Sequence, residues 1–68
     1  MEVFAKRLKE LRIEKNLSHL QLAREINVSN AAISRWENQL RVPNIIELKK
    51  IAEFFNVSAD YLLGLTEF

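Results

Sequence analysis

Residues 18–38 read SHLQLAREINVSNAAISRWEN, and the fold is most clearly predicted from this segment. Ser18 is followed three residues later by Gln21, which is the spacing of a capping box. In a capping box the two side chains bond free backbone amides at the start of a helix. Apolar residues then recur with helical spacing. The stretch therefore predicts a short helix over residues 19–26.

A tight turn and a second helix follow the first one. Asn27 tolerates the left-handed conformation that ends a helix, and Ser29 can accept hydrogen bonds from the first free amides of the next helix. Ile33 and Trp36 are spaced i, i+3, as on one helix face, so we expect a helix over residues 30–38. Two short helices joined by three residues form a helix-turn-helix.

The two faces of the second helix have different chemistry. Ile33 and Trp36 face the core, and Ala23 supplies the small side chain that a close helix crossing needs. The other face carries short side chains or amide- and guanidinium-tipped ones: Asn30, Ala31, Ser34, Arg35 and Asn38. Such side chains suit hydrogen bonding to base edges at close approach.

An amphipathic pattern precedes the helix-turn-helix and predicts a helix over residues 2–15. Five basic residues lie among its apolar positions, interleaved with Glu10 and Glu14. They are Lys6, Arg7, Lys9, Arg12 and Lys15. The mixture of signs favours a solvated face, with one or two of these residues touching a DNA backbone.

Two more helices are expected after the helix-turn-helix. Pro43 disfavours helix in the loop before it, and Asn44 with Glu47 repeats the capping box, which predicts a helix over 45–55. A fifth helix is expected over 59–63, capped by a serine and ended by the one glycine of the sequence. With one glycine and one proline, the chain is predicted to be all-α.

Length and composition restrict the class of protein. The 68 residues suffice for one small domain, and 49% apolar content indicates that it folds. The absence of cysteine excludes a disulfide scaffold and fits a reducing compartment. No run approaches about 18 apolar residues, and the start lacks the order of a signal peptide. We therefore expect a soluble cytoplasmic protein without a membrane segment.

Charge is unevenly distributed along the sequence. Residues 1–50 hold all ten Lys and Arg against six acids, a net charge of +4, whereas residues 51–68 hold three acids and no base, a net charge of −3. Such polarity would let one side of the protein face a polyanion while the other faces water or a partner.

In addition to this pattern, the sequence resembles the phage repressor and Cro type of helix-turn-helix, often called the xenobiotic-response-element family. The resemblance covers nearly the whole chain and follows the family's order without a gap. It is carried by Leu22-Ala23, Val28-Ser29, Ile33-Ser34-Arg35-Trp36-Glu37, Pro43, Leu48-Lys49-Lys50-Ile51-Ala52, Val57-Ser58 and Leu62-Leu63-Gly64. Membership implies a compact five-helix, lambda-repressor-like domain that inserts its third helix into the major groove of DNA.

The resemblance also implies roles for individual residues. Asn30 and Ala31 match the first base-contacting positions, where they could read adenine and a thymine methyl group. Arg35, one turn on, could bond guanine with both ends of its guanidinium, and Ser34 is a weaker base-reading candidate. For Arg35 the alternative is a solvated surface residue.

Four further residues match positions that tend to meet phosphates in this family: His19, Ser29, Asn38 and Arg41. For His19 the alternative is an exposed residue of the capping turn. The family commonly has glutamine at this position, and the sequence alone gives no ground for a pH switch here. Asn27 and Gln39 replace glycines, and a left-handed angle at Gln39 would cost roughly 1 kcal/mol or more. Glu37 is expected to pair with a nearby base or to cap locally.

We therefore predict a sequence-specific DNA-binding transcriptional regulator, most simply a repressor that binds a pseudo-palindromic operator as a homodimer. The alternative is an antitoxin or adaptor whose main partner is another protein. An apolar C-terminal end supports a dimer interface, formed by Tyr61, Leu62, Leu65 and Phe68. The alternative there is packing back onto the first helix.

Catalysis is not expected. The single histidine has no partner acid within sequence reach, and no glycine-rich phosphate loop is present. With one histidine and no cysteine, no metal site is expected either, and no cofactor.

Overall fold

The computed structural model describes residues 2–68, which form five α-helices and no β-strand. The helices are α1 (Glu2–Glu14), α2 (His19–Ile26), α3 (Asn30–Glu37), α4 (Ile45–Phe55) and α5 (Ala59–Leu63). The all-α prediction is confirmed. α1 and α3 each end one residue earlier than expected, because the backbone becomes left-handed at Asn16 and Gln39. Among the described residues, no helix has the length and apolar character that crossing a membrane requires.

Both predicted capping boxes are present. At α2, Ser18 Oγ accepts from the Gln21 amide at 3.1 Å, and Gln21 Oε1 accepts from the Ser18 amide at 2.8 Å. At α4, Asn44 and Glu47 exchange the same two bonds at 2.8 and 2.9 Å. Each box satisfies two amides that would otherwise lack a partner at the helix start.

The Asn-Val-Ser sequence occurs twice and forms the same corner each time. Asn27 and Asn56 end their helices in left-handed backbone, with φ of 57° and 55°. Ser29 and Ser58 then begin the next helix, and each hydroxyl accepts a hydrogen bond from the amide three residues further on. Asparagine tolerates left-handed backbone better than most residues, so this short sequence turns the chain without glycine.

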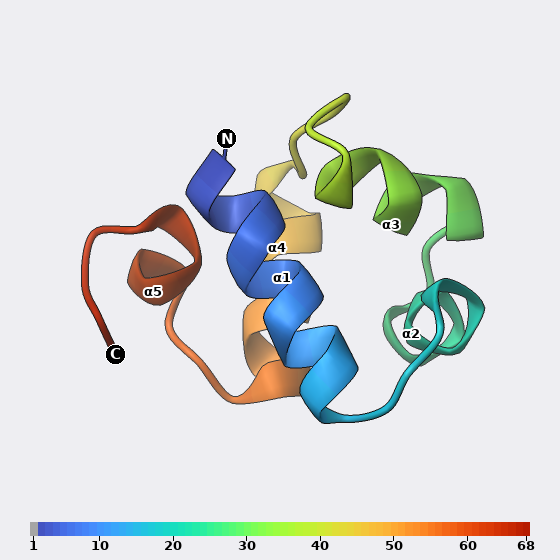
Figure 1. Ribbon diagram of the computed structural model, residues 1–68, viewed down its shortest axis with the longest axis horizontal. Helices are drawn as coiled ribbons and strands as arrows, with labels where there is room; N and C mark the ends of the chain where they lie inside the picture. Colours follow the sequence, from blue (N-terminus) through green and yellow to red (C-terminus); the bar gives the residue numbers. More distant parts are fainter. Residues whose placement is uncertain (1) are drawn as a thin grey trace.

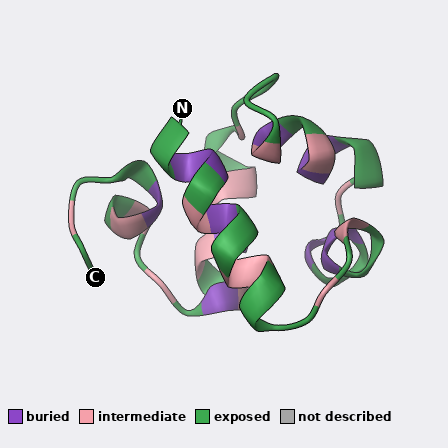
Figure 2. Cartoon of the chain, viewed as in Figure 1, coloured by how far each residue is buried: buried purple, intermediate pink, exposed green. Residues whose placement is uncertain are grey.

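Side chains from all five helices form one core. Figure 1 shows α1 crossing the middle of the molecule, with α2 and α3 on one side and α5 on the other. The largest fully buried side chains are Phe4 and Leu8 of α1, Leu22 of α2, Ile33 and Trp36 of α3, Ile51 of α4 and Leu62 of α5. The buried positions in Figure 2 accordingly face inward on each helix. Fully burying one large apolar side chain contributes about 1.5 to 3 kcal/mol.

The crossing of α2 and α3 has the small residue that the sequence predicts. Ala23 is buried at 2% exposure, and Ile33 is buried completely. Val28, in the turn between the helices, packs half-buried against the same core. These contacts hold α3 to α2 as one helix-turn-helix unit.

Gln39 and Gly64 also adopt left-handed backbone at helix ends, as Asn16 does. Gln39 has φ of 61°, which costs about 1 to 2 kcal/mol in a residue with a Cβ atom. Gly64 has φ of 80°, and a Cβ atom there would lie 2.9 Å from Val3 Cγ1. A larger residue at position 64 would therefore need both a strained backbone angle and a shift of the Val3 side chain, and Gly64 ends α5 as predicted.

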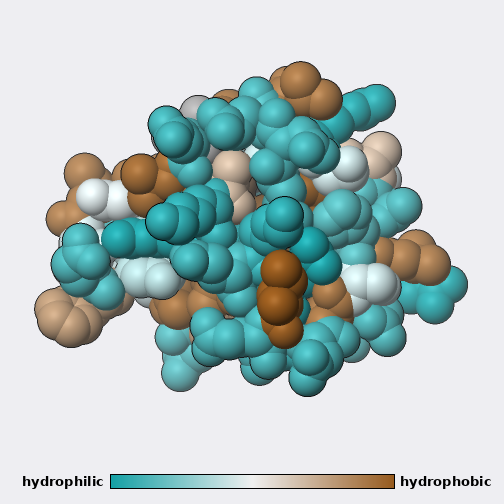
Figure 3. Space-filling model, viewed as in Figure 1, coloured by the Kyte–Doolittle hydropathy of each residue, from teal (hydrophilic) through white to brown (hydrophobic). Residues whose placement is uncertain are grey.

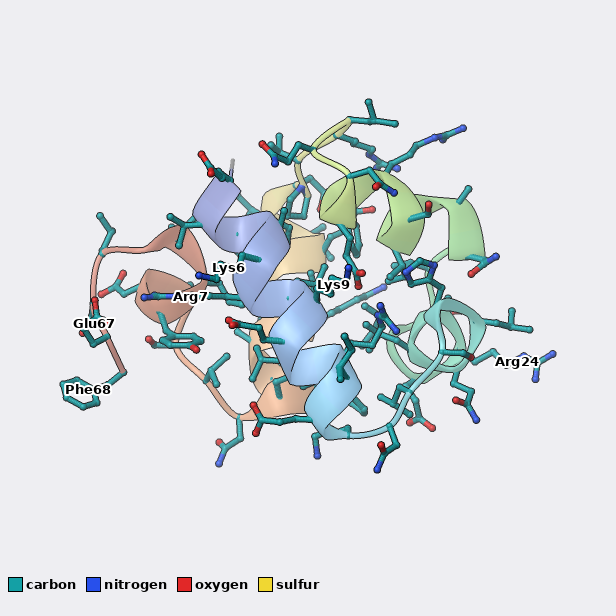
Figure 4. All side chains as sticks on the ribbon, viewed as in Figure 1. Lys6, Arg7, Lys9, Arg24, Glu67 and Phe68 are labelled. Carbon is teal, nitrogen blue, oxygen red and sulfur yellow. The ribbon has the colours of Figure 1, made fainter. Side chains whose placement is uncertain are left out.

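The C-terminal tail, residues 64–68, folds back toward α1. Arg7 donates to the carbonyl oxygens of Tyr61 and Thr66, and its guanidinium stacks 4.2 Å from the centre of the Tyr61 ring. In Figure 4, Arg7 reaches from α1 toward the segment that carries Glu67 and Phe68. The Arg7 side chain is only 15% exposed, so the prediction that Arg7 belongs to a solvated face is wrong.

The predicted apolar interface at this end is also partly wrong. Leu62 is completely buried in the core and cannot contact another molecule, and Tyr61 is half-buried beneath Arg7. The chain packs back onto α1 here, which was the alternative expectation. Leu65 and Phe68 remain exposed at 74% and 91%.

Candidate nucleic-acid interface

α3 divides its residues between two faces. The buried face consists of Ala32, Ile33 and Trp36, which anchor the helix in the core. The predicted base-reading residues lie elsewhere on the helix surface: Asn30, Ala31 and Arg35 are exposed, and Ser34 is half-buried. Three buried anchors within eight residues hold these side chains on a rigid support.

Two of the predicted phosphate-contacting residues bond locally at the ends of α3. The Ser29 hydroxyl accepts from the Ala32 amide at 3.1 Å, which leaves its own hydrogen free to donate. Asn38 Nδ2 donates to the Ser34 carbonyl oxygen at 2.8 Å. Both side chains are exposed, so the structure places a polar group at each end of the helix.

Arg41, a third predicted phosphate contact, lies in the loop after α3 and pairs with Glu47. Its guanidinium is 3.2 and 3.4 Å from the two carboxylate oxygens of Glu47. One of these oxygens also accepts the Asn44 amide of the capping box. The carboxylate that caps α4 thus also orients Arg41, whose side chain stays 42% exposed.

Arg12 and Glu37 form a nearly buried ion pair between α1 and the last residue of α3. Arg12 Nε and one terminal nitrogen donate to the two carboxylate oxygens at 2.7 and 2.9 Å. The side chains are 12% and 5% exposed. The hydrogen bond that Arg12 donates to Glu37 raises the pKa of Arg12 above its usual value, although burial opposes the rise. A charged guanidinium is therefore fixed against the end of α3.

This pair confirms the expectation that Glu37 pairs with a basic side chain. It also shows that the prediction of a solvated face was wrong for Arg12, whose side chain is only 12% exposed. Sequence reasoning missed Arg12 because nothing distinguishes it from the other basic residues of α1. The sequence did carry a signal at Glu37, because this residue directly follows the core residue Trp36. A carboxylate that is buried beside a core residue needs a charged or hydrogen-bonding partner.

His19, the first residue of α2, approaches the same carboxylate. Its Nε2 atom lies 3.2 Å from Glu37 Oε1, the oxygen that also accepts from Arg12. The His19 side chain is 36% exposed, so part of the ring is accessible. Glu37 therefore joins three helices, α1, α2 and α3, at the base of the predicted interface.

Besides Ile13 of α1 and Leu20 of α2, the exposed large apolar residues fall into two groups. The loop surface consists of Leu40 and Val42, in the loop after α3, and Ile45 and Ile46, at the start of α4. The tail surface consists of Val3, Leu63, Leu65 and Phe68. The face seen in Figure 3 is otherwise mostly hydrophilic. Within residues 2–68 neither Arg24 nor Arg35 takes part in an ion pair, and Arg24 extends away from the body in Figure 4.

The five-helix core and the exposed face of α3 define a helix-turn-helix domain. Residues 8–62 match the family described as Helix-turn-helix, and the chain belongs to that family. It is a family of DNA-binding domains and not of enzymes, which confirms the prediction that the chain is not an enzyme. The chain is 47% identical over 61 residues to the HTH-type transcriptional activator BcrR of Enterococcus faecalis. That match covers 90% of this chain and only 30% of BcrR.

Solved structures support the same assignment. The chain is similar to the P22 c2 repressor in a complex with a synthetic operator, with a TM-score of 0.85 and 29% identity over 91% of this chain and 94% of that one. It is equally similar to the N-terminal DNA-binding domain of SinR from Bacillus subtilis, with a TM-score of 0.85 and 31% identity over 93% of each chain. The resemblance to repressor-type helix-turn-helix domains is thus confirmed.

Proposed function

We propose that this chain binds double-stranded DNA at specific sequences, with α3 in the major groove, and that it regulates transcription. The observation that carries the proposal is the exposed polar face of α3, held by three buried anchors and by the Glu37 ion pair. A rigid helix with short polar side chains can approach base edges closely. The similarity to the P22 c2 repressor, which was solved with an operator, supports this reading.

In this proposal base reading falls to four residues of α3. Asn30 reads adenine, Ala31 contacts a thymine methyl group and Arg35 bonds guanine through both ends of its guanidinium, with a lesser role for Ser34. Arg35 suits this task because it is exposed and, within the described chain, bound to no carboxylate.

Contacts to the DNA backbone would surround α3 and fix its register. Ser29 and Asn38 lie at its two ends, Arg41 lies in the following loop and His19 begins α2. Such phosphate contacts position a protein on the duplex without reading sequence. Their positions around one helix support a common DNA-facing side.

We further propose that two copies bind a pseudo-palindromic operator and repress by occupying it. One recognition helix reads only a few base pairs, and half-sites lie about 34 Å apart, one turn of DNA. The Cα trace is 28 Å long in its longest dimension, so copies on adjacent half-sites would nearly touch. The loop surface follows α3 directly, and we assign it to that contact.

The tail surface fits this dimer less well. It lies at the opposite end of the long axis from α3 in Figure 1. A dimer through Leu65 and Phe68 would place two 28 Å long axes end to end and move the recognition helices well beyond one turn of DNA. If the chain is instead an antitoxin or adaptor, Leu65 and Phe68 are where we would expect a protein partner to bind.

The proposal is tested by selecting bound duplexes from a random pool at about 150 mM salt, since affinity depends strongly on salt. Enrichment of a two-fold symmetric sequence is expected. Enrichment of a single half-site would contradict the proposed dimer but would still support sequence-specific base contacts. A folded protein that enriches no sequence would favour the antitoxin or adaptor function.

A further inference from the structure

The His19 ring has one nitrogen engaged and one accessible. Nε2 lies 3.2 Å from the Glu37 carboxylate, and the side chain is 36% exposed. We propose that His19 binds a DNA phosphate as the doubly protonated imidazolium, with Nε2 donating to Glu37 and Nδ1 donating to the phosphate. DNA binding then takes up a proton. This inference rests on the proposed DNA-binding function.

Glu37 is fixed as the acceptor in this arrangement. Arg12 donates to both of its oxygens, and another Arg12 nitrogen donates to the Leu17 carbonyl oxygen at 2.8 Å. The Glu37 side chain is 5% exposed, so it has little freedom to turn away. An ionised carboxylate only accepts hydrogen bonds, so this contact is a hydrogen bond only when the ring nitrogen that faces the carboxylate carries a hydrogen.

The protonation state of the ring decides what the second nitrogen can do. A neutral imidazole has a single N–H group. If Nε2 holds that hydrogen and donates to Glu37, Nδ1 presents a lone pair, which repels a phosphate oxygen. If Nδ1 holds it, the lone pair of Nε2 faces the carboxylate. Only the imidazolium donates on both sides.

The groups around His19 favour this charged form once DNA is present. Glu37 faces it from α3, and Arg12 reaches the same carboxylate from α1. The positive charge of Arg12 is already paired with Glu37, so a phosphate would add a second negative partner beside the ring. An opposite charge within about 4 to 6 Å favours the charged state of a titratable group. A glutamine at this position would bind a phosphate without any change in protonation.

The sign of the pH effect follows from this linkage. The complex favours the protonated ring, so affinity is highest where the imidazole is already charged and falls as rising pH removes that proton. One fully linked proton changes affinity tenfold for each pH unit. We expect a loss of about tenfold between pH 6 and pH 8, since the linkage is incomplete at the ends of this range.

The test compares the protein with His19→Gln, which keeps a hydrogen-bond donor but does not titrate. His19 is the only histidine in the sequence, so the substitution removes every imidazole. Dissociation constants are measured on one duplex from the selection experiment at pH 6, 7 and 8 and constant salt. Calorimetry at pH 7 in buffers of different ionisation enthalpy counts the protons taken up. Circular dichroism verifies that both proteins are folded.

The expected result is a tenfold pH dependence and net proton uptake for the protein, and neither for His19→Gln. Equal pH dependence in both proteins would overturn the inference, because another group would then be responsible. The same holds if the protein binds DNA without proton uptake. Folded proteins that both fail to bind the duplex at every pH would instead contradict the proposed DNA-binding function.

Discussion

Two arginines of α1, Arg7 and Arg12, hold opposite ends of the molecule by different means. Arg12 binds the nearly buried carboxylate of Glu37 at the end of α3, whereas Arg7 binds backbone carbonyl oxygens and the ring of Tyr61 and reaches only the exposed carboxylate of Glu67, at 3.7 Å. The first contact fixes a charged group beside the recognition helix. The second ties down a segment remote from α3. The same residue type in one helix thus supports the DNA-reading unit at one end and only the fold at the other.

The largest effect is expected where the buried ion pair is broken. Arg12→Met leaves the Glu37 carboxylate in the interior without its main partner, which typically costs about 3 to 5 kcal/mol. A domain of this size has a net stability of only about 3 to 5 kcal/mol, so the variant should be largely unfolded at 25 °C. Urea denaturation followed by circular dichroism measures the change.

A matched double variant isolates the charge from the packing. Arg12→Met combined with Glu37→Leu removes both charges and should recover most of the lost stability, because replacing a whole buried pair is far less costly than removing one partner. If Arg12→Met alone costs less than about 1 kcal/mol, the pair does not hold α3 to α1 in the way the contacts indicate.

Arg35 extends the comparison to an arginine without a carboxylate partner. Arg35→Ala should cost about 1 to 3 kcal/mol of binding free energy on the preferred duplex and little on random DNA, with stability nearly unchanged. Titration of both duplexes at fixed salt measures this. Arg24→Ala is the control, since Arg24 is also exposed and unpaired among the described residues but extends away from the body. An equal loss on both duplexes would reduce Arg35 to a phosphate contact.

The sequence predicted the local features of this fold and missed the distant ones. Helix starts and corners depend on neighbours within four residues, so Ser18 with Gln21 and the two Asn-Val-Ser corners could be read directly. Arg12 and Glu37 are 25 residues apart, and only the packing of α1 against α3 brings them together. The prediction that Leu62 lies in an interface was wrong for the same reason, since its burial depends on the packing of α5 against distant helices.

In the candidate site, too, the local features could be predicted from the sequence, whereas the contacts between helices could not. The face of α3 follows from helical periodicity once the buried positions Ile33 and Trp36 are identified. The environments of His19 and Arg41 do not, because each depends on a carboxylate from another helix, Glu37 for the first and Glu47 for the second. Periodicity assigns a face, whereas a partner on another element requires the tertiary structure.

A smaller effect is expected for Arg7, where α1 contacts the C-terminal tail. Arg7→Ala removes the stacking on Tyr61 and the bonds to two carbonyl oxygens, and should lower the free energy of unfolding by about 1 to 2 kcal/mol. DNA affinity of the folded variant should not change, because the tail lies far from α3. Glu67→Ala removes only the exposed ion pair of Arg7, at 3.7 Å, and is the control. It should change stability by less than about 0.5 kcal/mol, because the Glu67 side chain is 86% exposed. A loss of DNA affinity in folded Arg7→Ala would mean that the two ends are coupled.

The smallest effect is expected for Arg41, the exposed arginine of the loop after α3. Its pair with Glu47 is solvent-accessible and contributes less than about 1 kcal/mol to folding, so Arg41→Ala should unfold at nearly the same urea concentration. If the guanidinium meets a phosphate, the variant weakens binding to all duplexes alike and lowers the salt slope by about one. Lys6→Ala, in the N-terminal half of α1, should leave the salt slope unchanged. An unchanged slope for Arg41→Ala would remove Arg41 from the interface and leave it as a partner of the α4 cap.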